Sequence, residues 1–224
     1  LNLFVQFGAP EHILYQAQPH IGTNKLPHII TAMREQLLQC GAEVLFEKKV
    51  VDFIIDNNKI GSVKTADRDM FEADAFILAT GHSARDIFEL LNQKQILIEA
   101  KPFALGVRIE HPQSLIDTIQ YHCSTRDEYL PPASYSLVQQ VNKRGVFSFC
   151  MCPGGIIAPA ATSAGELVVN GWSPSKRNNP FANSGMVVQV ELEDIFITPG
   201  SKIKNDALAM MHFQQSVERS CFQA

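Results

Sequence analysis

The segment that most constrains the fold of this chain is a run of apolar residues at positions 75–79, AFILA. A strand with one solvated face alternates apolar and polar residues, whereas an unbroken apolar run is typical of a strand covered on both faces. Thr80 and Gly81 end the run, and Ile87 and Leu90 then have the spacing of a helix face. We therefore expect a covered strand that leads through a glycine turn into a helix, as in α/β domains.

The segments before this run predict a helix and a small antiparallel meander. Residues 26–39 place apolar side chains at helical spacing, and Gly41 follows as a left-handed stop. Residues 43–46 predict a strand. Residues 50–65 contain two strand-like runs joined by the polar turn DNNK, which predicts a hairpin, and a third strand is expected at 70–73.

Beyond residue 99 the chain changes character, because prolines interrupt short strand-like segments. These segments lie at 103–109, 135–141 and 146–151. They favour antiparallel strands joined by long loops, and a helix is expected at 206–222. We therefore predict an α/β chain of mixed α+β character with two domains, residues 1–99 and residues 100–224.

Composition and charge exclude several kinds of partner. The net charge is −4 and the pI is about 6.0, so nothing indicates nucleic acid as a partner. No apolar run approaches the roughly 20 residues that span a bilayer. The five cysteines are odd in number and irregularly spaced, which favours reduced thiols and a cytoplasmic location. Because Leu1 is not an initiator Met and the last helix lacks a cap, we expect a piece of a longer protein.

Five peptides spread along the chain resemble one family of proteins. They are PHIGTNKL (19–26), ATGHSARD (79–86), KPFALGVRIEHP (101–112), FSFCMCPGG (147–155) and ANSG (182–185). Together they are similar to an uncharacterised family of FAD-dependent dehydrogenases. The order of helix, meander, apolar strand and Ala-Thr-Gly turn also resembles large flavoproteins, in which glycine lets the backbone pass close to a bulky cofactor.

The resemblance implies that residues 1–99 are part of an FAD-binding domain with a β-meander and that residues 100–224 are a largely antiparallel substrate domain. It also implies a βαβ unit with GxGxxG before this chain and a further FAD-contacting segment after it. The sequence itself contains no such phosphate loop, so we expect the chain alone to bind FAD weakly or not at all and to be inactive. The full-length parent is expected to be an FAD-dependent oxidoreductase that acts on a small molecule, with NAD(P)H as a further partner.

The resemblance also implies candidate site residues. Val50 matches a strand residue whose backbone touches the adenine, and Thr80 and Gly81 match the turn that lines the cofactor. His20 and Lys25 precede a helix that lies beside the flavin ring in related proteins, where they could stabilise a reduced flavin or a substrate anion. The alternatives are a core position for Val50, a solvated Lys25 and a His20 packed on a turn.

Cys150 and Cys152 form a C-x-C pair on an expected strand, so both side chains should point the same way. A zinc site would need further ligands at suitable spacing, and we expect no metal. A redox dithiol would be strained at this separation, and a pair of small residues beside the substrate is the third interpretation. The peptide running into Pro153 faintly resembles the substrate strand of geranylgeranyl reductases, which indicates an apolar or conjugated substrate.

Two arginines have competing interpretations. His82 and Arg85 lie where a helix begins and could attract an anion, but we expect Arg85 to pair with Asp86 or another carboxylate. Arg108 alternates with Glu110 on one strand, and we expect an ion pair between them rather than a contact with an acidic substrate. Two further functions remain open for the chain: a non-catalytic binding module with a flavoprotein-like fold, and a thiol-based redox protein that uses the two neighbouring cysteines.

Overall fold

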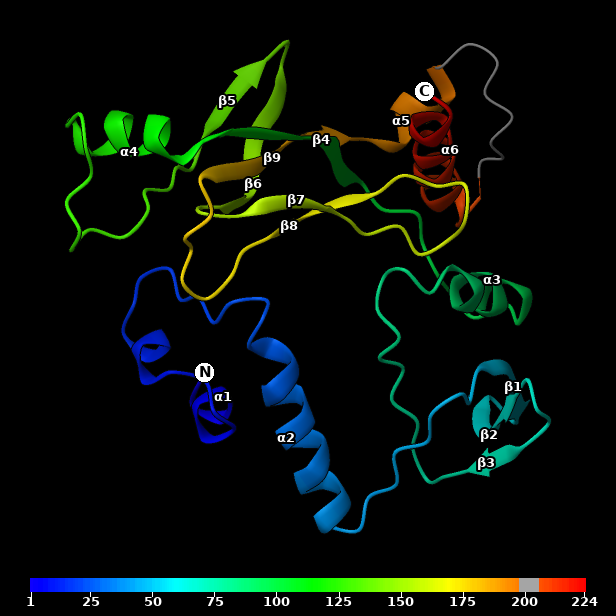
Figure 1. Ribbon diagram of the computed structural model, residues 1–224. Coiled ribbons are helices and arrows are strands. Elements are labelled where there is room, and N and C mark those ends of the chain that lie inside the picture. The colour runs from blue at the N-terminus through cyan, green and yellow to red at the C-terminus, as the bar shows by residue number, and fades with distance from the viewer. Residues whose placement is uncertain (198–205) are drawn as a thin grey trace. The chain divides into compact units, whose positions relative to one another are not determined.

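The computed structural model describes residues 1–197 and 206–224, which divide into two compact units (Figure 1). The first unit, which we name the sheet unit, contains Leu1–Val44, Phe103–Ala161 and Leu167–Val190. The second, which we name the meander unit, contains Leu45–Pro102, Thr162–Glu166 and the described part of Glu191–Ala224. The chain therefore crosses between the units several times. The expected domain boundary near residue 99 stays a prediction.

The sheet unit is built on a four-stranded antiparallel sheet with the order β4-β9-β6-β5. Its strands are β4 (Phe103–Pro112), β5 (Val138–Val141), β6 (Arg144–Cys152) and β9 (Phe181–Val190). The pairing of β4 with β9 is continuous from Phe103 opposite Val190 to Pro112 opposite Phe181. Because an unbroken register fixes which side chains share a face, this pair positions the residues of the site described below.

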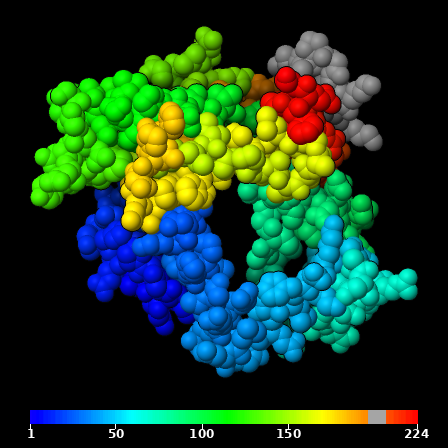
Figure 2. All heavy atoms as spheres, viewed as in Figure 1, coloured from blue at the N-terminus to red at the C-terminus, as the bar shows by residue number. Residues whose placement is uncertain are grey.

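A second, two-stranded sheet and four helical segments complete the sheet unit. The strands β7 (Ile156–Pro159) and β8 (Val169–Trp172) are antiparallel, and their atoms lie beside those of β4 in the space-filling view (Figure 2). The helical segments are α1 (Asn2–Gln6), the 3-10 helix η1 (Glu11–Leu14), α2 (Leu26–Gln39) and α4 (Gln113–Tyr121). The bounds of α2 confirm the helix predicted from apolar spacing, and Ile29 of α2 packs in a small core with Ile13.

The meander unit contains the predicted three-stranded meander. Its strands are β1 (Val50–Asp56), β2 (Lys59–Thr65) and β3 (Met70–Glu72), in that order. Asn57 and Asn58 join the first two strands, and both have positive φ, which is the backbone of the tight turns that suit a hairpin. The helices are α3 (Arg85–Gln93), α5 (Leu192–Ile197) and α6 (Ala209–Gln223). Phe53, Ile87 and Leu90 form the core between the meander and α3.

Two predicted strands are wrong in this structure. Residues 43–46 and 75–79 form no ladder with any described strand. Ile77 is 92% exposed, so the unbroken apolar run is not covered on both faces, and Phe46 of the other segment is 68% exposed. A strand needs a hydrogen-bonding neighbour as well as apolar side chains, and the described residues do not supply one here.

The fold class is mixed α+β with mostly antiparallel sheets, and this part of the expectation is confirmed. The described residues do not display the parallel sheet and glycine-rich phosphate loop of an FAD-binding domain. Among the same residues, no helix combines the length and the apolar character that crossing a membrane requires.

Candidate functional site

The sheet unit brings two arginines, an asparagine and a cysteine together at one end of β6. We name Arg108, Cys152, Arg177 and Asn183 the arginine–thiol cluster. Cys152 on β6 is the register partner of Asn183 on β9, and Arg108 lies on β4 at the other side of β9. The register of β6 shifts between Phe149 and Cys152. This irregularity interrupts the regular strand geometry that would point the Cys150 and Cys152 side chains the same way.

Arg108 is held by neutral groups rather than by a carboxylate. Its Nη1 donates to the side-chain oxygen of Asn183, and its Nη2 lies 3.1 Å from the carbonyl oxygen of Cys150. The same Nη1 lies 4.0 Å from the sulfur of Cys152. The expected ion pair with Glu110 is therefore wrong. The N–H groups of the guanidinium donate instead to the Asn183 amide and to the Cys150 carbonyl at the bulged end of β6.

A glycine on the neighbouring strand makes room for this contact. A Cβ atom at Gly171 of β8 would lie 2.4 Å from Nη1 of Arg108 and 2.5 Å from the sulfur of Cys152. Real Cβ atoms do not approach other atoms so closely, so any larger residue would displace one of the two side chains. Gly171 therefore allows β8 to pack directly over the cluster.

Arg177 reaches the cluster from the loop after β8. Its position depends on Gly154, where a Cβ would lie 1.9 Å from the carbonyl oxygen of Arg177. The backbone N–H of Gly154 donates to Oε1 of Gln113 over 2.8 Å, and Nε2 of Gln113 donates to Asp117 over 2.8 Å. Burial lowers the pKa of Arg177, and the nearby thiol of Cys152 acts in the opposite direction.

His20 lies beside the same loop, in the segment that the resemblance singles out. Its Nε2 is 3.0 Å from the carbonyl oxygen of Pro174, and the N–H of Thr23 donates to the carbonyl of Ser173 over 3.0 Å. Burial lowers the pKa of His20 and the Pro174 carbonyl raises it, while the charge of Arg177 and that of His12 lower it further. The net direction is downward, and burial is the largest cause.

Two polar atoms of the cluster are buried without a hydrogen-bond partner among residues 1–197 and 206–224. They are Nδ2 of Asn183 and Nε of Arg177. Asn183 has no exposed surface, and its amide orientation is fixed because the guanidinium of Arg108 can only donate, which assigns the accepting oxygen to that contact. Among the described acidic residues, none forms an ion pair with Arg108 or Arg177.

The meander unit contains a separate apolar cavity of about 250 Å³. It is lined by residues of β1 and β2, by the segment before Thr80, and by the inner face of α3. Val50 and Thr80, two of the predicted cofactor contacts, both line it. Gly81 follows with φ of +75°, and a Cβ there would meet no atom within 4 Å, so its backbone borders open space.

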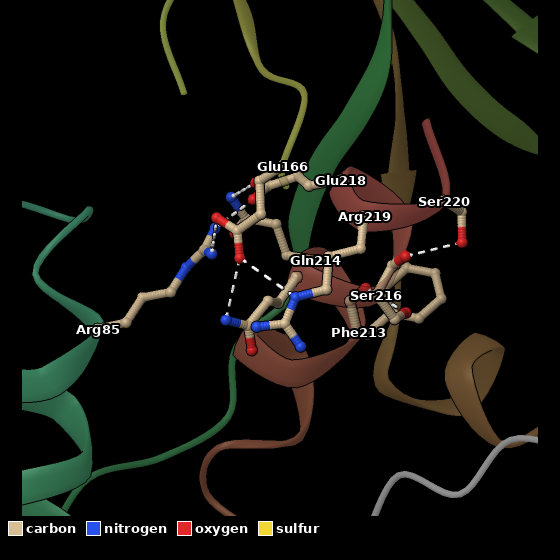
Figure 3. A network of polar contacts seen from close by, with 9 residues as sticks. Arg85, Glu166, Phe213, Gln214, Ser216, Glu218, Arg219 and Ser220 are labelled. Carbon is tan, nitrogen blue, oxygen red and sulfur yellow. Dashed lines mark hydrogen bonds and ion pairs between the residues drawn. The ribbon is translucent and has the colours of Figure 1, made fainter. Parts of the chain in front are cut away.

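The start of α3 is fixed by a network of charges within the meander unit (Figure 3). Arg85 Nη1 is 2.8 Å from Oε2 of Glu166, and Nη2 is 2.5 Å from Oε2 of Glu218. Burial raises the pKa of Glu166, but Gln215 and Arg85 outweigh it and the net pKa is lowered. The expectation that Arg85 pairs with a carboxylate is confirmed, and Asp86 instead pairs with Lys49 at 2.8 Å. Arg85 thus forms structural ion pairs.

The remaining predicted site residues are separate from these contacts. Lys25 is exposed at the position before α2, and His82 is exposed. All five cysteines are free thiols, with Cys150 exposed and Cys152 half-buried. In the described part of the chain, no group of three or more His, Cys, Asp or Glu side chains could hold a metal ion.

Sequence reasoning missed Arg177 altogether, since no motif contains it.

Comparison with known proteins shows the family of this chain. Residues 102–224 match the family described as "FAD-dependent protein, C-terminal domain-like". The chain belongs to this family. It is also 39% identical over 224 residues to an uncharacterized protein of Clostridium beijerinckii (strain ATCC 51743 / NCIMB 8052). The alignment covers 99% of this chain and 40% of the relative, so the chain spans well under half of the longer protein's length.

Proposed function

We propose that this chain is part of a flavoprotein oxidoreductase whose complete polypeptide transfers a hydride or electrons between FAD and a small organic substrate. The family match over residues 102–224 supports the flavin. The observation that carries the proposal is the apolar cavity of the meander unit, because Val50 and Thr80 line it and Gly81 follows directly. These are the residues that the resemblance assigns to the cofactor.

The cavity fits part of FAD. An apolar slot suits a flat aromatic ring such as adenine, and the open space in front of Gly81 would let a large group approach the backbone. Its volume of about 250 Å³ is below the roughly 300–1,000 Å³ typical of pockets that enclose a whole drug-sized ligand. The described residues also contain no GxGxxG loop for the pyrophosphate. We therefore expect the rest of the longer polypeptide to hold the phosphates.

The division of roles follows from this partial fit. Bound FAD would supply the hydride or electron transfer, as flavins do in other oxidoreductases. Val50, Thr80 and Gly81 would hold the cofactor, and residues 100–224 would form most of a domain that holds the substrate. His20 and Lys25 are proposed to lie near the reacting groups, and NAD(P)H is a proposed electron donor. Residues 1–99 would contribute part of the FAD-binding domain. The enzyme would be cytoplasmic.

Flavin content tests the proposal directly. The full-length Clostridium beijerinckii relative, purified from a host supplied with riboflavin, should be yellow and contain FAD near one equivalent by absorbance after denaturation. Replacing the residue of the relative that aligns with Gly81 by valine should lower the content at least tenfold, because the side chain enters the space next to the cavity. Alanine at the position that aligns with Gly61, where a Cβ would lie 4.0 Å from the nearest atom, is the matched control.

Two results would reject parts of the proposal. A colourless relative that does not take up added FAD would remove the flavin itself. The 224-residue chain alone should hold little or no FAD, and near-stoichiometric flavin in it would show that the cofactor site does not depend on further polypeptide.

A thiol-based reaction is the second candidate, since a guanidinium nitrogen lies 4.0 Å from the Cys152 sulfur. Titration of the chain with a thiol reagent before and after dithiothreitol measures any disulfide between Cys150 and Cys152. Equal counts, together with an unchanged rate of flavin reduction in the relative when serine replaces the residue aligned with Cys152, would remove a redox role. The remaining alternative, a binding module without catalysis, predicts flavin binding without reduction by NAD(P)H.

A further inference from the structure

The arginine–thiol cluster has positive charge without a matching negative group among the residues that the structure describes. Arg108 and Arg177 both lie within interaction range of the Cys152 thiol, and His20 lies within range of Arg177. Neither arginine pairs with a described carboxylate, and every group that Arg108 contacts is neutral or a thiol. This differs from Arg85 and Arg126 of the same chain, each of which pairs with a largely buried carboxylate.

Both buried atoms that lack a partner among the described residues belong to residues of the cluster. Nδ2 of Asn183 belongs to the same amide as the oxygen that accepts from Arg108, so it is part of the cluster. Nε of Arg177 is the second such atom. Both are donors, and a buried donor without a partner destabilises the fold unless a ligand or ordered water accepts from it. An acceptor-rich, negatively charged group would satisfy the donors and the charge together.

We propose that Arg108, Arg177 and Asn183 form a binding site for a small oxyanion, the carboxylate or phosphate group of a ligand. Guanidinium groups bind such oxyanions through paired N–H donors, and these charge-assisted hydrogen bonds are stronger than those between neutral groups. Gly171 lets β8 pack against the guanidinium of Arg108, and Gly154 lets the backbone of Arg177 approach closely. The site concerns the sheet unit alone and does not depend on the flavin proposed above.

Isothermal titration of the 224-residue chain with sodium succinate and, separately, with sodium phosphate tests the site. Both titrations are made at constant ionic strength, with sodium chloride as the reference. Saturable binding of either anion with a stoichiometry near one supports the proposal, and the anion that binds more tightly identifies the group as carboxylate or phosphate. Absence of saturable binding by both overturns it.

Variants locate the binding. Arg177→Gln should weaken binding at least tenfold, because one of the two guanidiniums is lost. Lys176→Gln removes the same charge from the adjacent, exposed residue and should leave the affinity unchanged. Equal weakening by both substitutions would show a general charge effect and overturn the assignment.

A second variant tests the site without a ligand and remains informative if Arg177→Gln fails to fold. Asn183→Asp replaces the partnerless amide nitrogen with a carboxylate oxygen beside Arg108, so the chain supplies its own anion. The midpoint of thermal unfolding should rise, and binding of succinate and phosphate should be lost. A lower midpoint, or undiminished binding, would contradict the proposal.

Discussion

Arg85 and Glu166 are 81 positions apart in the sequence, yet Nη1 of Arg85 lies 2.8 Å from Oε2 of Glu166. Glu218, which is 133 positions from Arg85, accepts from the second terminal nitrogen of the same guanidinium (Figure 3). The side chains of Glu166 and Glu218 are 1% and 7% exposed, so two nearly buried carboxylates share one arginine. This contact joins α3, the segment before β8 and α6 within the meander unit.

Replacing Arg85 by leucine should destabilise the chain strongly. The substitution leaves Glu166 and Glu218 buried without their main counter-charge, and breaking a buried pair in this way costs about 3–5 kcal/mol. Urea unfolding followed by circular dichroism measures the loss. Lys49→Met is the control, because the ion pair of Lys49 with Asp86 joins two side chains that are 66% and 49% exposed. The urea midpoint of this variant should stay within error of that of the unmodified chain. Equal effects would show that burial does not distinguish the two pairs.

Acid should destabilise the chain partly through Glu166. Its pKa is lower in the folded chain than its ordinary value of 4.5, so the unfolded chain binds this proton more tightly. The contribution of Glu166 is therefore fully present above pH 4.5 and decreases as the pH falls through the lowered pKa. Glu166→Gln should make urea unfolding midpoints less dependent on pH between 5 and about 3. An unchanged slope would assign the acid sensitivity to other carboxyl groups.

His20 should titrate below its ordinary value of 6.5 in the folded chain. Burial is the largest cause, so Arg177→Gln should raise the pKa of His20 only part of the way back, by removing one of the two nearby positive groups, the other being His12. NMR titration of the imidazole measures both values. Because the unfolded chain binds this proton more tightly, stability through His20 decreases as the pH falls below 6.5. A His20 pKa that does not respond to Arg177→Gln would contradict their electrostatic contact.

Gly171→Ala should disturb the arginine–thiol cluster. The added methyl group would lie 2.4 Å from Nη1 of Arg108 and 2.5 Å from the sulfur of Cys152, so at least one side chain must move. Overpacking of this kind costs about 1–3 kcal/mol, and displaced Arg108 should bind succinate or phosphate at least tenfold more weakly. Urea unfolding and isothermal titration measure the two effects. Gly61→Ala adds the same methyl group with no atom closer than 4.0 Å and should leave anion binding unchanged.

Local sequence patterns predicted the elements whose stability depends on near neighbours. The helix at 26–39 was predictable because its apolar spacing and the following Gly41 are both local signals. The hairpin was predictable for the same reason, since Asn57 and Asn58 readily adopt the positive φ of its turn. The pairing of Arg85 with a carboxylate was predicted, but its partners were not, because they come from distant segments.

The sequence by itself determined the mixed α+β character, the meander and the family resemblance, because these depend on residue types at short spacing. Only the tertiary structure decided that residues 75–79 have no strand neighbour in the described part of the chain and that Arg108 contacts Asn183 and Cys152 instead of Glu110. The physical reason is that strand ladders and clusters of charged side chains require partners from remote parts of the chain. Their register depends on long-range packing, such as the close approach at Gly171, and no local pattern encodes that distance.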